Sequence, residues 1–233
     1  MIGALAAPPL ARLLRSPAAI ASVAAWAFLA TAIAVMAHQD GWFHGADRVL
    51  IGPYGSLILP LLAYTIVGAV LGSRAYATSV APLVALGASP ARATLVAVGV
   101  SAAICAAAAA LVGIAVVVLA HGGGDPPRLS DAAATAYAAA LGGAAYAAWF
   151  SWGSAMIRRG IGRAALLVVD CVAGASDGVP GWLTPRAHLR NLLGGTGPVE
   201  FTQTASAVAL VVLGVACAAL AAQHARRHAL AGA

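Results

Sequence analysis

Side chains able to do chemistry are few in this sequence, and Asp170 is the only acid that lies within an apolar run. If that run enters a membrane, an ionised carboxylate there is unfavourable unless it meets a partner or a water-filled cavity. Asp170 is therefore a candidate pathway or gating residue. The alternative is a structural role, in which Asp170 hydrogen-bonds to a neighbouring helix near the outer end of a short span.

Metal ligands occur at two places along the chain. His224 and His228 are four residues apart, which suits a metal on a helix, but Arg226 and Arg227 lie between them and repel a cation. Four further ligands lie on the loop after the first apolar run: His38, Asp40, His44 and Asp47. Exposed polar residues are ordinary on such a loop. We expect no metal site on this chain.

The residues that nucleotide binding and catalysis need are missing. All 13 basic residues are Arg, and a phosphate-binding P-loop requires Gly-Lys-Ser/Thr. Ser154, in Trp152-Gly-Ser154, lacks a second Gly and a His partner in its own apolar run. Cys105, Cys171 and Cys217 stand far apart in apolar runs, so neither a disulfide framework nor a zinc site is indicated. We expect no enzyme and no cofactor on this chain.

Composition places the chain in a membrane. Of its 233 residues, 62% are hydrophobic and only 9% are charged, whereas soluble domains carry about 25% charged residues. The predicted fold is all-α, a polytopic transmembrane domain covering residues 1–233. Its six predicted spans are residues 17–37, 50–72, 93–120, 132–157, 161–175 and 204–222. The first follows Arg12 and Arg15 and is expected to be a retained anchor rather than a cleaved signal.

Arginine placement predicts the orientation of these spans. With six spans, nine of the thirteen Arg fall on the side of the termini, where no acid lies: Arg12, Arg15, Arg74, Arg92, Arg158, Arg159, Arg163, Arg226 and Arg227. By the positive-inside rule both termini are cytoplasmic. Topology therefore explains the basic excess, and we expect no nucleic-acid partner.

Three segments between or before the spans have patterns of their own. Residues 8–17 alternate Leu with Arg between prolines, which indicates a short interfacial helix of under two turns or an unstructured basic flank. Residues 73–92 are too apolar for an exposed loop and predict a cytoplasmic helix over about 76–88, ending near Gly87. Because Leu83 and Leu86 would be exposed there, this helix must lie on the membrane or against a partner.

The third segment is external and predicts a helix over 184–194. Thr184 is its expected cap, Pro185 suits the first helical position and Gly194 suits a C-terminal stop. Its leucines share one side: Leu189, Leu192 and Leu193. Its polar residues are spread over the rest: Arg186, His188, Arg190 and Asn191. We predict a small amphipathic helix at the outer leaflet.

Taken together, these segments resemble the membrane subunits of type-2 ATP-binding-cassette (ABC) exporters, and the resemblance covers nearly the whole chain. Thr184-Pro185-x-x-His188, followed by Leu192-Leu193-Gly194, is similar to the Ser-Pro-x-x-His…Gly stretch of many of these permeases. The segment from Leu86 to Arg92, Leu-Gly-Ala-Ser-Pro-Ala-Arg, is similar to the family's Ala-x-Pro-x-Ser-Arg segment in the coupling-helix region. The family's Gly-Thr-Leu-Glu element is replaced here by Thr-Ser-Val-Ala at 78–81.

The resemblance implies a permease subunit in a bacterial plasma membrane that exports a hydrophobic or amphipathic substrate. It implies a second permease chain, as a homodimer or heterodimer, and two ABC ATP-binding subunits that hold ATP and Mg. Contact with the ATPase is expected from Arg74, Leu83, Leu86 and Arg92. The external gate is expected at Pro185, His188, Leu189, Leu192 and Gly194. A non-transporting membrane scaffold or assembly subunit stays open as the alternative.

Overall fold

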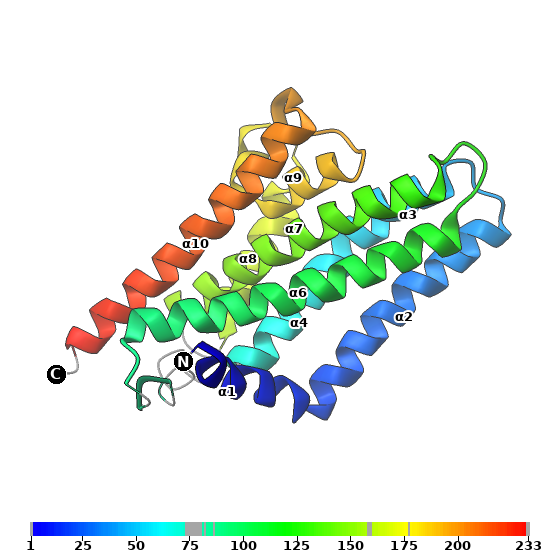
Figure 1. The fold of residues 1–233 in the computed structure, drawn as a ribbon. Coiled ribbons are helices and arrows are strands. Elements are labelled where there is room, and N and C mark those ends of the chain that lie inside the picture. Colours follow the sequence, from blue (N-terminus) through cyan, green and yellow to red (C-terminus); the bar gives the residue numbers. More distant parts are fainter. Residues whose placement is uncertain are drawn as a thin grey trace.

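The computed structural model describes residues 2–72, 81, 83–85, 87–157, 160–176 and 178–231, and the regular structure in these residues is entirely helical. Within the described residues, nine α-helices occur in chain order (Figure 1): α1 (Ile2–Leu14), α2 (Pro17–Gln39), α3 (Gly45–Val49), α4 (Leu59–Leu71), α6 (Pro90–Ala120), α7 (Arg128–Met156), α8 (Ile161–Ala173), α9 (Pro185–Leu192) and α10 (Gln203–Ala231). Among the described residues, a π-helical segment, η1 (Leu50–Ile58), joins α3 to α4, and two short 3-10 helices, η3 (Val179–Leu183) and η4 (Pro198–Glu200), flank α9.

Four helices are long and apolar enough to cross a membrane: Pro17–Gln39, Gly45–Leu71, Pro90–Ala120 and Gln203–Arg227. Each contains most or all of one predicted span, so the protein is an all-α, multi-pass membrane protein. The two other predicted spans correspond to α7 and α8. Helix α7 has 29 residues but is less apolar, and α8, with 13 residues, is only about 20 Å long.

Helix α7 lies inside the bundle, in contact with α4, α6, α8, α9 and α10. Small residues allow this close packing. A Cβ atom added at Gly143 would lie 2.6 Å from the Cys105 carbonyl oxygen of α6, and one at Gly142 would lie 2.7 Å from Leu189 Cδ1 of α9. Helix contacts in membranes are enriched in small residues for this reason. The low hydropathy of α7 therefore reflects contact with protein rather than with lipid.

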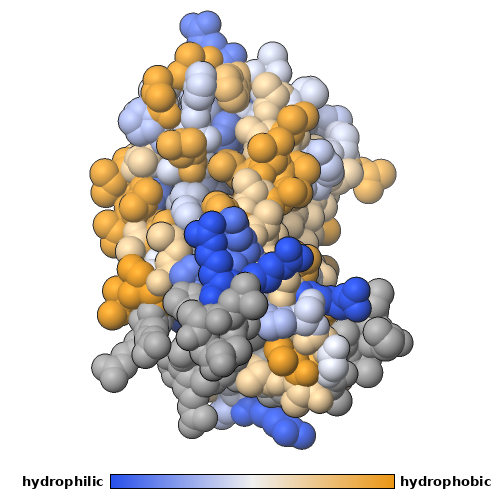
Figure 2. Space-filling model, turned by 90° about the vertical axis from the view of Figure 1, so that its left-hand side faces the viewer, coloured by the Kyte–Doolittle hydropathy of each residue, from blue (hydrophilic) through white to orange (hydrophobic). Residues whose placement is uncertain are grey.

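The outer helices instead expose large apolar side chains. These include Phe28 of α2, Leu111 of α6, Val172 of α8, and Val208, Val212 and Val215 of α10. On the face shown in Figure 2, orange and tan apolar residues lie over much of the surface among paler ones, and a blue, hydrophilic cluster lies near its centre. Apolar surface this extensive is typical of a lipid-facing protein rather than of a soluble monomer.

The second predicted span, 50–72, is broken rather than continuous. Its helical path runs through α3, η1 and α4, and Gly52 inside η1 has the non-helical angles φ −77° and ψ −107°. Pro53 follows directly, and a proline has no amide proton for the helical ladder and crowds the preceding turn. The break therefore has a local cause in the Gly-Pro pair.

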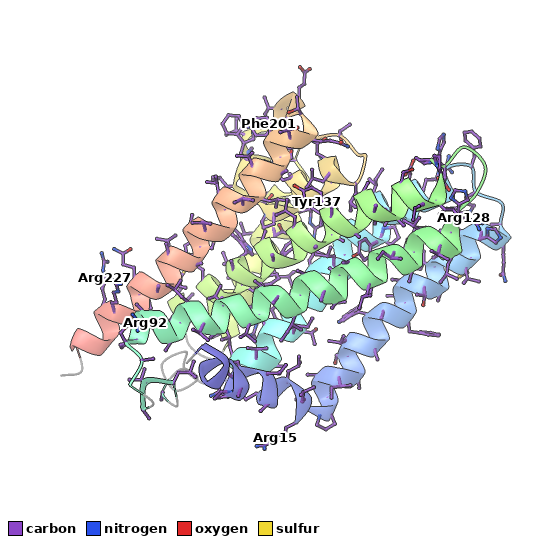
Figure 3. The ribbon with its side chains drawn as sticks, in the orientation of Figure 1. Arg15, Arg92, Arg128, Tyr137, Phe201 and Arg227 are labelled. Atoms are coloured by element: carbon purple, nitrogen blue, oxygen red, sulfur yellow. The ribbon has the colours of Figure 1, made fainter. Side chains whose placement is uncertain are left out.

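Both chain termini lie at the same end of the bundle (Figure 1). Arg15, Arg92 and Arg227 lie toward that end, and Arg128 lies at the opposite one (Figure 3). Helix α1 also belongs to the terminal end, where Arg12 Nη1 donates to the Val70 carbonyl oxygen at 3.4 Å. The prediction that prolines limit residues 8–17 to under two turns is wrong, because α1 runs through both of them and packs on α4 and α6.

Candidate functional site

Helix α9 (Pro185–Leu192) lies within the helix predicted over 184–194. Pro185 is its first residue, and Gly194, at φ +92°, lies just beyond its end. The amide of Gly195 donates to the Arg190 carbonyl oxygen at 2.9 Å and that of Gly194 to Asn191 at 3.2 Å. This pair of bonds is the Schellman motif, in which a left-handed residue, usually Gly, ends the helix.

The N-terminal cap of α9 comes from another helix. Thr184 occupies the N-cap position, but its hydroxyl donates to the Gly181 carbonyl oxygen at 3.1 Å and caps no amide. Instead, Asp170 Oδ1 of α8 accepts the backbone N–H of Arg186 at 3.1 Å. The predicted position of the cap is right, and the predicted capping side chain is wrong. A carboxylate is favourable at this place because the N-terminus of a helix carries partial positive charge.

Asp170 is fully buried and joins three elements. Its Oδ2 accepts hydrogen bonds from the Tyr146 hydroxyl of α7 at 2.8 Å and from Arg186 Nε of α9 at 3.2 Å. Arg186 Nη2 also donates to Cys171 Sγ at 3.1 Å. A buried carboxylate is stable when it is paired and hydrogen-bonded in this way. Both of its oxygens are engaged by protein donors, so the geometry favours the structural alternative over a pathway role.

His188 is also fully buried, within a chain of hydrogen bonds that reaches α10. Its Nε2 lies 3.0 Å from the Trp182 carbonyl oxygen and its Nδ1 lies 3.3 Å from Ser206 Oγ. A carbonyl only accepts, so Nε2 carries the proton and Nδ1 accepts from Ser206. Asn191 Nδ2 in turn donates to Ser206 Oγ at 2.8 Å and to the Phe201 carbonyl oxygen at 2.7 Å.

This pattern requires a neutral imidazole. Burial lowers the pKa of His188, and the bond to the Trp182 carbonyl opposes that shift only in part. Protonation would turn Nδ1 into a donor facing the Ser206 hydroxyl, whose own proton would have to turn away. His188 is thus an anchor of α9 rather than an exposed proton carrier.

The buried side of α9 differs from the predicted leucine face. Leu189 is fully buried against Gly142, and Leu193 is also buried, but Leu192 is only partly covered. His188 and Asn191, expected on the polar side, are buried as well. The helix is therefore embedded among α7, α10 and η3, and the predicted division into a buried leucine side and an exposed polar side is wrong. We call α9 together with these contacts the α9 seat.

At the other end, the predicted ATPase contact is only partly described. Arg74, Leu86 and most of the predicted helix 76–88 lie outside the described residues. Gly87 has φ +85°, and Ala88 donates to the Leu83 carbonyl oxygen at 3.2 Å, which fits a helix ending at the predicted glycine. Arg92 is exposed in the first turn of α6.

Leu83 is not exposed for contact with a partner, as the sequence had predicted it to be. Its side chain is only 1% exposed and belongs to the apolar core of this chain, whereas the adjacent Val84 is 37% exposed. The expectation that Leu83 is exposed for a partner is therefore wrong. Leu83 packs inside its own chain, whereas Val84 and Arg92 are among the described residues of this segment that are exposed.

Sequence reasoning missed Tyr146 and Arg186 as the partners of Asp170. Tyr146 lies fully buried on α7. A signal for Arg186 was available: a buried acid needs a donor, and Arg186 is the first cation after it in the sequence, beside a predicted helix start.

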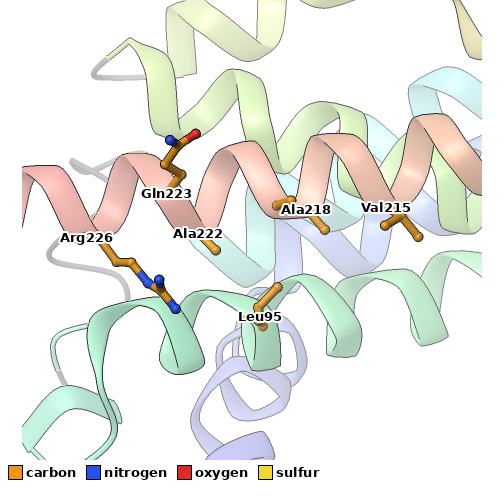
Figure 4. Close-up of a pocket in the computed structure, with 7 residues that line it drawn as sticks. Leu95, Val215, Ala218, Ala222, Gln223 and Arg226 are labelled. Carbon is orange, nitrogen blue, oxygen red and sulfur yellow. The ribbon is translucent and has the colours of Figure 1, made fainter.

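An open groove lies between α6 and α10 (Figure 4). It is lined by Leu95, Val215, Ala218, Ala219, Ala222, Gln223 and Arg226. Gln223 and Arg226 lie toward one end and Val215 toward the other (Figure 4). The groove is therefore apolar over most of its length with a cationic end, a lining that suits an amphipathic molecule better than a nucleotide.

Comparison with family models, with curated proteins and with solved structures found no match to this chain. The class that the fold defines is a multi-pass, all-helical membrane protein. The resemblance to ABC exporters therefore rests on the residues quoted above.

Proposed function

We propose that this chain is the membrane-spanning permease subunit of an ATP-driven ABC exporter, with both termini cytoplasmic. In this proposal α7 and α8 complete six spans. The permease subunit pairs with a second permease chain, and this dimer moves a hydrophobic or amphipathic substrate outward. ATP and Mg are held by two separate ATP-binding subunits, since this sequence has no P-loop.

The α9 seat is the observation that carries the proposal. The residues that resemble the exporter motif each have a distinct structural role: Pro185 begins the helix, His188 anchors it and Gly194 ends it. The helix is held against α7 and α10, away from the end with the termini. A motif whose members build one small module is more informative than a chance match of the same letters.

The arrangement of the ends also supports this topology. Helices α6, α7, α8 and α10 alternate in direction (Figure 1), as successive spans must, although α8 is short. Arg15, Arg92 and Arg227 lie with the termini, which the positive-inside rule assigns to the cytoplasm. A partner ATPase would then meet the exposed Val84 and Arg92.

The test is copurification of the full chain with an ATPase from native membranes, followed by ATP hydrolysis in proteoliposomes. Val84→Asp and Arg92→Glu should each reduce ATPase capture or substrate-stimulated hydrolysis, because they alter an accessible contact at the cytoplasmic end. Asp40→Asn, an exposed change on the loop at the opposite end, is the matched control.

His188→Gln tests the other end of the same chain. It should impair substrate movement while leaving ATPase capture and membrane insertion intact. A stable complex without any ATPase, or unchanged hydrolysis in both Val84→Asp and Arg92→Glu, would favour a non-transporting scaffold and overturn the proposal.

A further inference from the structure

Three potential metal ligands from two separate loops meet near the start of α3. His44, Asp47 and Asp125 each present a ligand atom, and these atoms lie within 4.8 Å of one another. His44 and Asp47 come from the α2–α3 region, and Asp125 comes from the connection between α6 and α7. In sequence the two halves are almost eighty residues apart, so only the fold brings them together.

The site is held by hydrogen bonds that leave ligand atoms free. Asp125 Oδ2 accepts from the backbone amides of Ala46 at 3.1 Å and Gly122 at 2.8 Å. Its Oδ1 is buried and has no hydrogen-bond partner. The amide of His44 donates to the Gly123 carbonyl oxygen at 2.9 Å, and φ of +54° puts His44 in the left-handed region. Its Nδ1 is buried, has no hydrogen-bond partner, and lies 3.6 Å from Asp47 Oδ2.

A further acidic side chain interacts with the carboxylates of this cluster. Asp131, in the first turn of α7, is only 9% exposed, and its Oδ2 has no hydrogen-bond partner. The charges of Asp47 and Asp125 act on Asp131, while His121 and a side-chain hydrogen bond with Thr135 oppose them. A buried carboxylate oxygen without a donor is uncommon, and a bound cation is one way to compensate it.

We propose that His44, Asp47 and Asp125 bind one divalent transition-metal ion of the Zn²⁺ type. One imidazole nitrogen and two carboxylate oxygens form a ligand set that zinc uses, and water can supply the fourth position. Tetrahedral ligands about 2.1 Å from a zinc ion lie about 3.4 Å apart. His44 Nδ1 and Asp47 Oδ2 are 3.6 Å apart, and both side chains are partly exposed, so a small rotation can bring these two atoms to the spacing of zinc ligands.

The ion would join the loop after α2 to the loop after α6. Each loop ends a candidate membrane-spanning helix, so the ion would fix the spacing of these two helices at the end opposite the termini. This inference concerns metal binding alone and does not depend on the exporter assignment. It can therefore succeed or fail separately.

Tag-free, chelator-treated full-length protein in detergent is titrated with ZnCl2, with binding followed calorimetrically and unfolding followed by tryptophan fluorescence. We expect one Zn²⁺ per chain and a Tm increase of at least about 5 °C at 100 times the Kd. His44→Asn and Asp125→Asn should each weaken Zn²⁺ binding at least about tenfold. Asn tolerates a positive φ, and at position 125 it keeps one oxygen for the two backbone amides.

Asp40→Asn, which changes an exposed carboxylate on the same loop, should bind Zn²⁺ as the unaltered chain does. MgCl2 and CaCl2 should produce no comparable increase in Tm, because hard cations prefer all-oxygen sites. The proposal is overturned if Zn²⁺ does not bind, if binding survives unchanged in both His44→Asn and Asp125→Asn, or if only Mg²⁺ or Ca²⁺ stabilises the protein.

Discussion

Helix α8 carries one buried charge toward each of its ends, and the two are treated in opposite ways. Near its C-terminal end, Asp170 accepts three hydrogen bonds, one of them from the Arg186 side chain. Near its N-terminal end, Arg163 is only 7% exposed and stands over the Tyr64 ring, with its guanidinium carbon 4.8 Å from the ring centroid. Among the described residues, none hydrogen-bonds to Arg163 Nε or Nη1.

The difference shows that a buried charge can stabilise one end of a helix and contribute little to the stability of the other end. A paired and bonded charge fixes its neighbours, because removing one partner leaves the other uncompensated. A buried guanidinium that has only an aromatic face retains most of its desolvation penalty. The end of α8 at the α9 seat should therefore be rigid and sensitive to mutation, and the end at Arg163 should tolerate an apolar replacement.

The largest effect should come from Asp170→Ala. It leaves Arg186 and Tyr146 without their acceptor and removes the cap of α9, which should lower the free energy of unfolding by about 3–5 kcal/mol. Thermal unfolding in detergent should show a Tm lower by more than about 6 °C. A fall of under about 2 °C, similar to that of the exposed control Asp40→Asn, would show that the pair is not structural.

Leu189→Ala should come next. It removes a fully buried side chain from the contact with Gly142, so the expected loss is about 2–4 kcal/mol. Leu192→Ala is the matched control on the same helix and should lose less, since Leu192 is only partly buried. Equal Tm changes for the two variants would contradict the buried face described for α9.

The third prediction concerns pH and His188. Because its pKa is lower in the folded protein than the unfolded value of about 6.5, protonation favours the unfolded state. The contribution of the neutral form is complete above that value and is lost as pH falls below it, by at most about 1.4 kcal/mol per pH unit. Comparing Tm at several pH values between the unaltered chain and His188→Gln isolates the contribution of His188 protonation to stability. Identical profiles would remove His188 as the titrating group.

The smallest effect is expected from Arg163→Met. An apolar chain of similar length removes a desolvated charge and gives up one cation–π contact, so the free energy of unfolding should change by less than about 1 kcal/mol in either direction. Unfolding of the two proteins in matched detergent measures the difference. A loss above about 2 kcal/mol would mean that Arg163 has a strong partner and that the two ends of α8 are alike.

Much of the architecture followed from local pattern. Four predicted spans coincide with helices long and apolar enough to cross a membrane, because the length of an apolar run is a property of the chain alone. The start and end of α9 were predicted from Pro185 and Gly194 for a similar reason, since backbone constraints act within a few residues.

What the sequence left undetermined depends on contacts between distant residues. The sequence predicted that Leu83 is exposed, yet it is buried in the core. No partner of Asp170 was predicted from the sequence, whereas the fold places Tyr146 of α7 and Arg186 of α9 within hydrogen-bond distance of it. The proximity of His44 and Asp125 is likewise a contact between residues that are distant in the sequence. Apolar length and helix punctuation are local, so one sequence determines them. The partner of a buried charge is set by which helices pack together, and only the tertiary structure decides that.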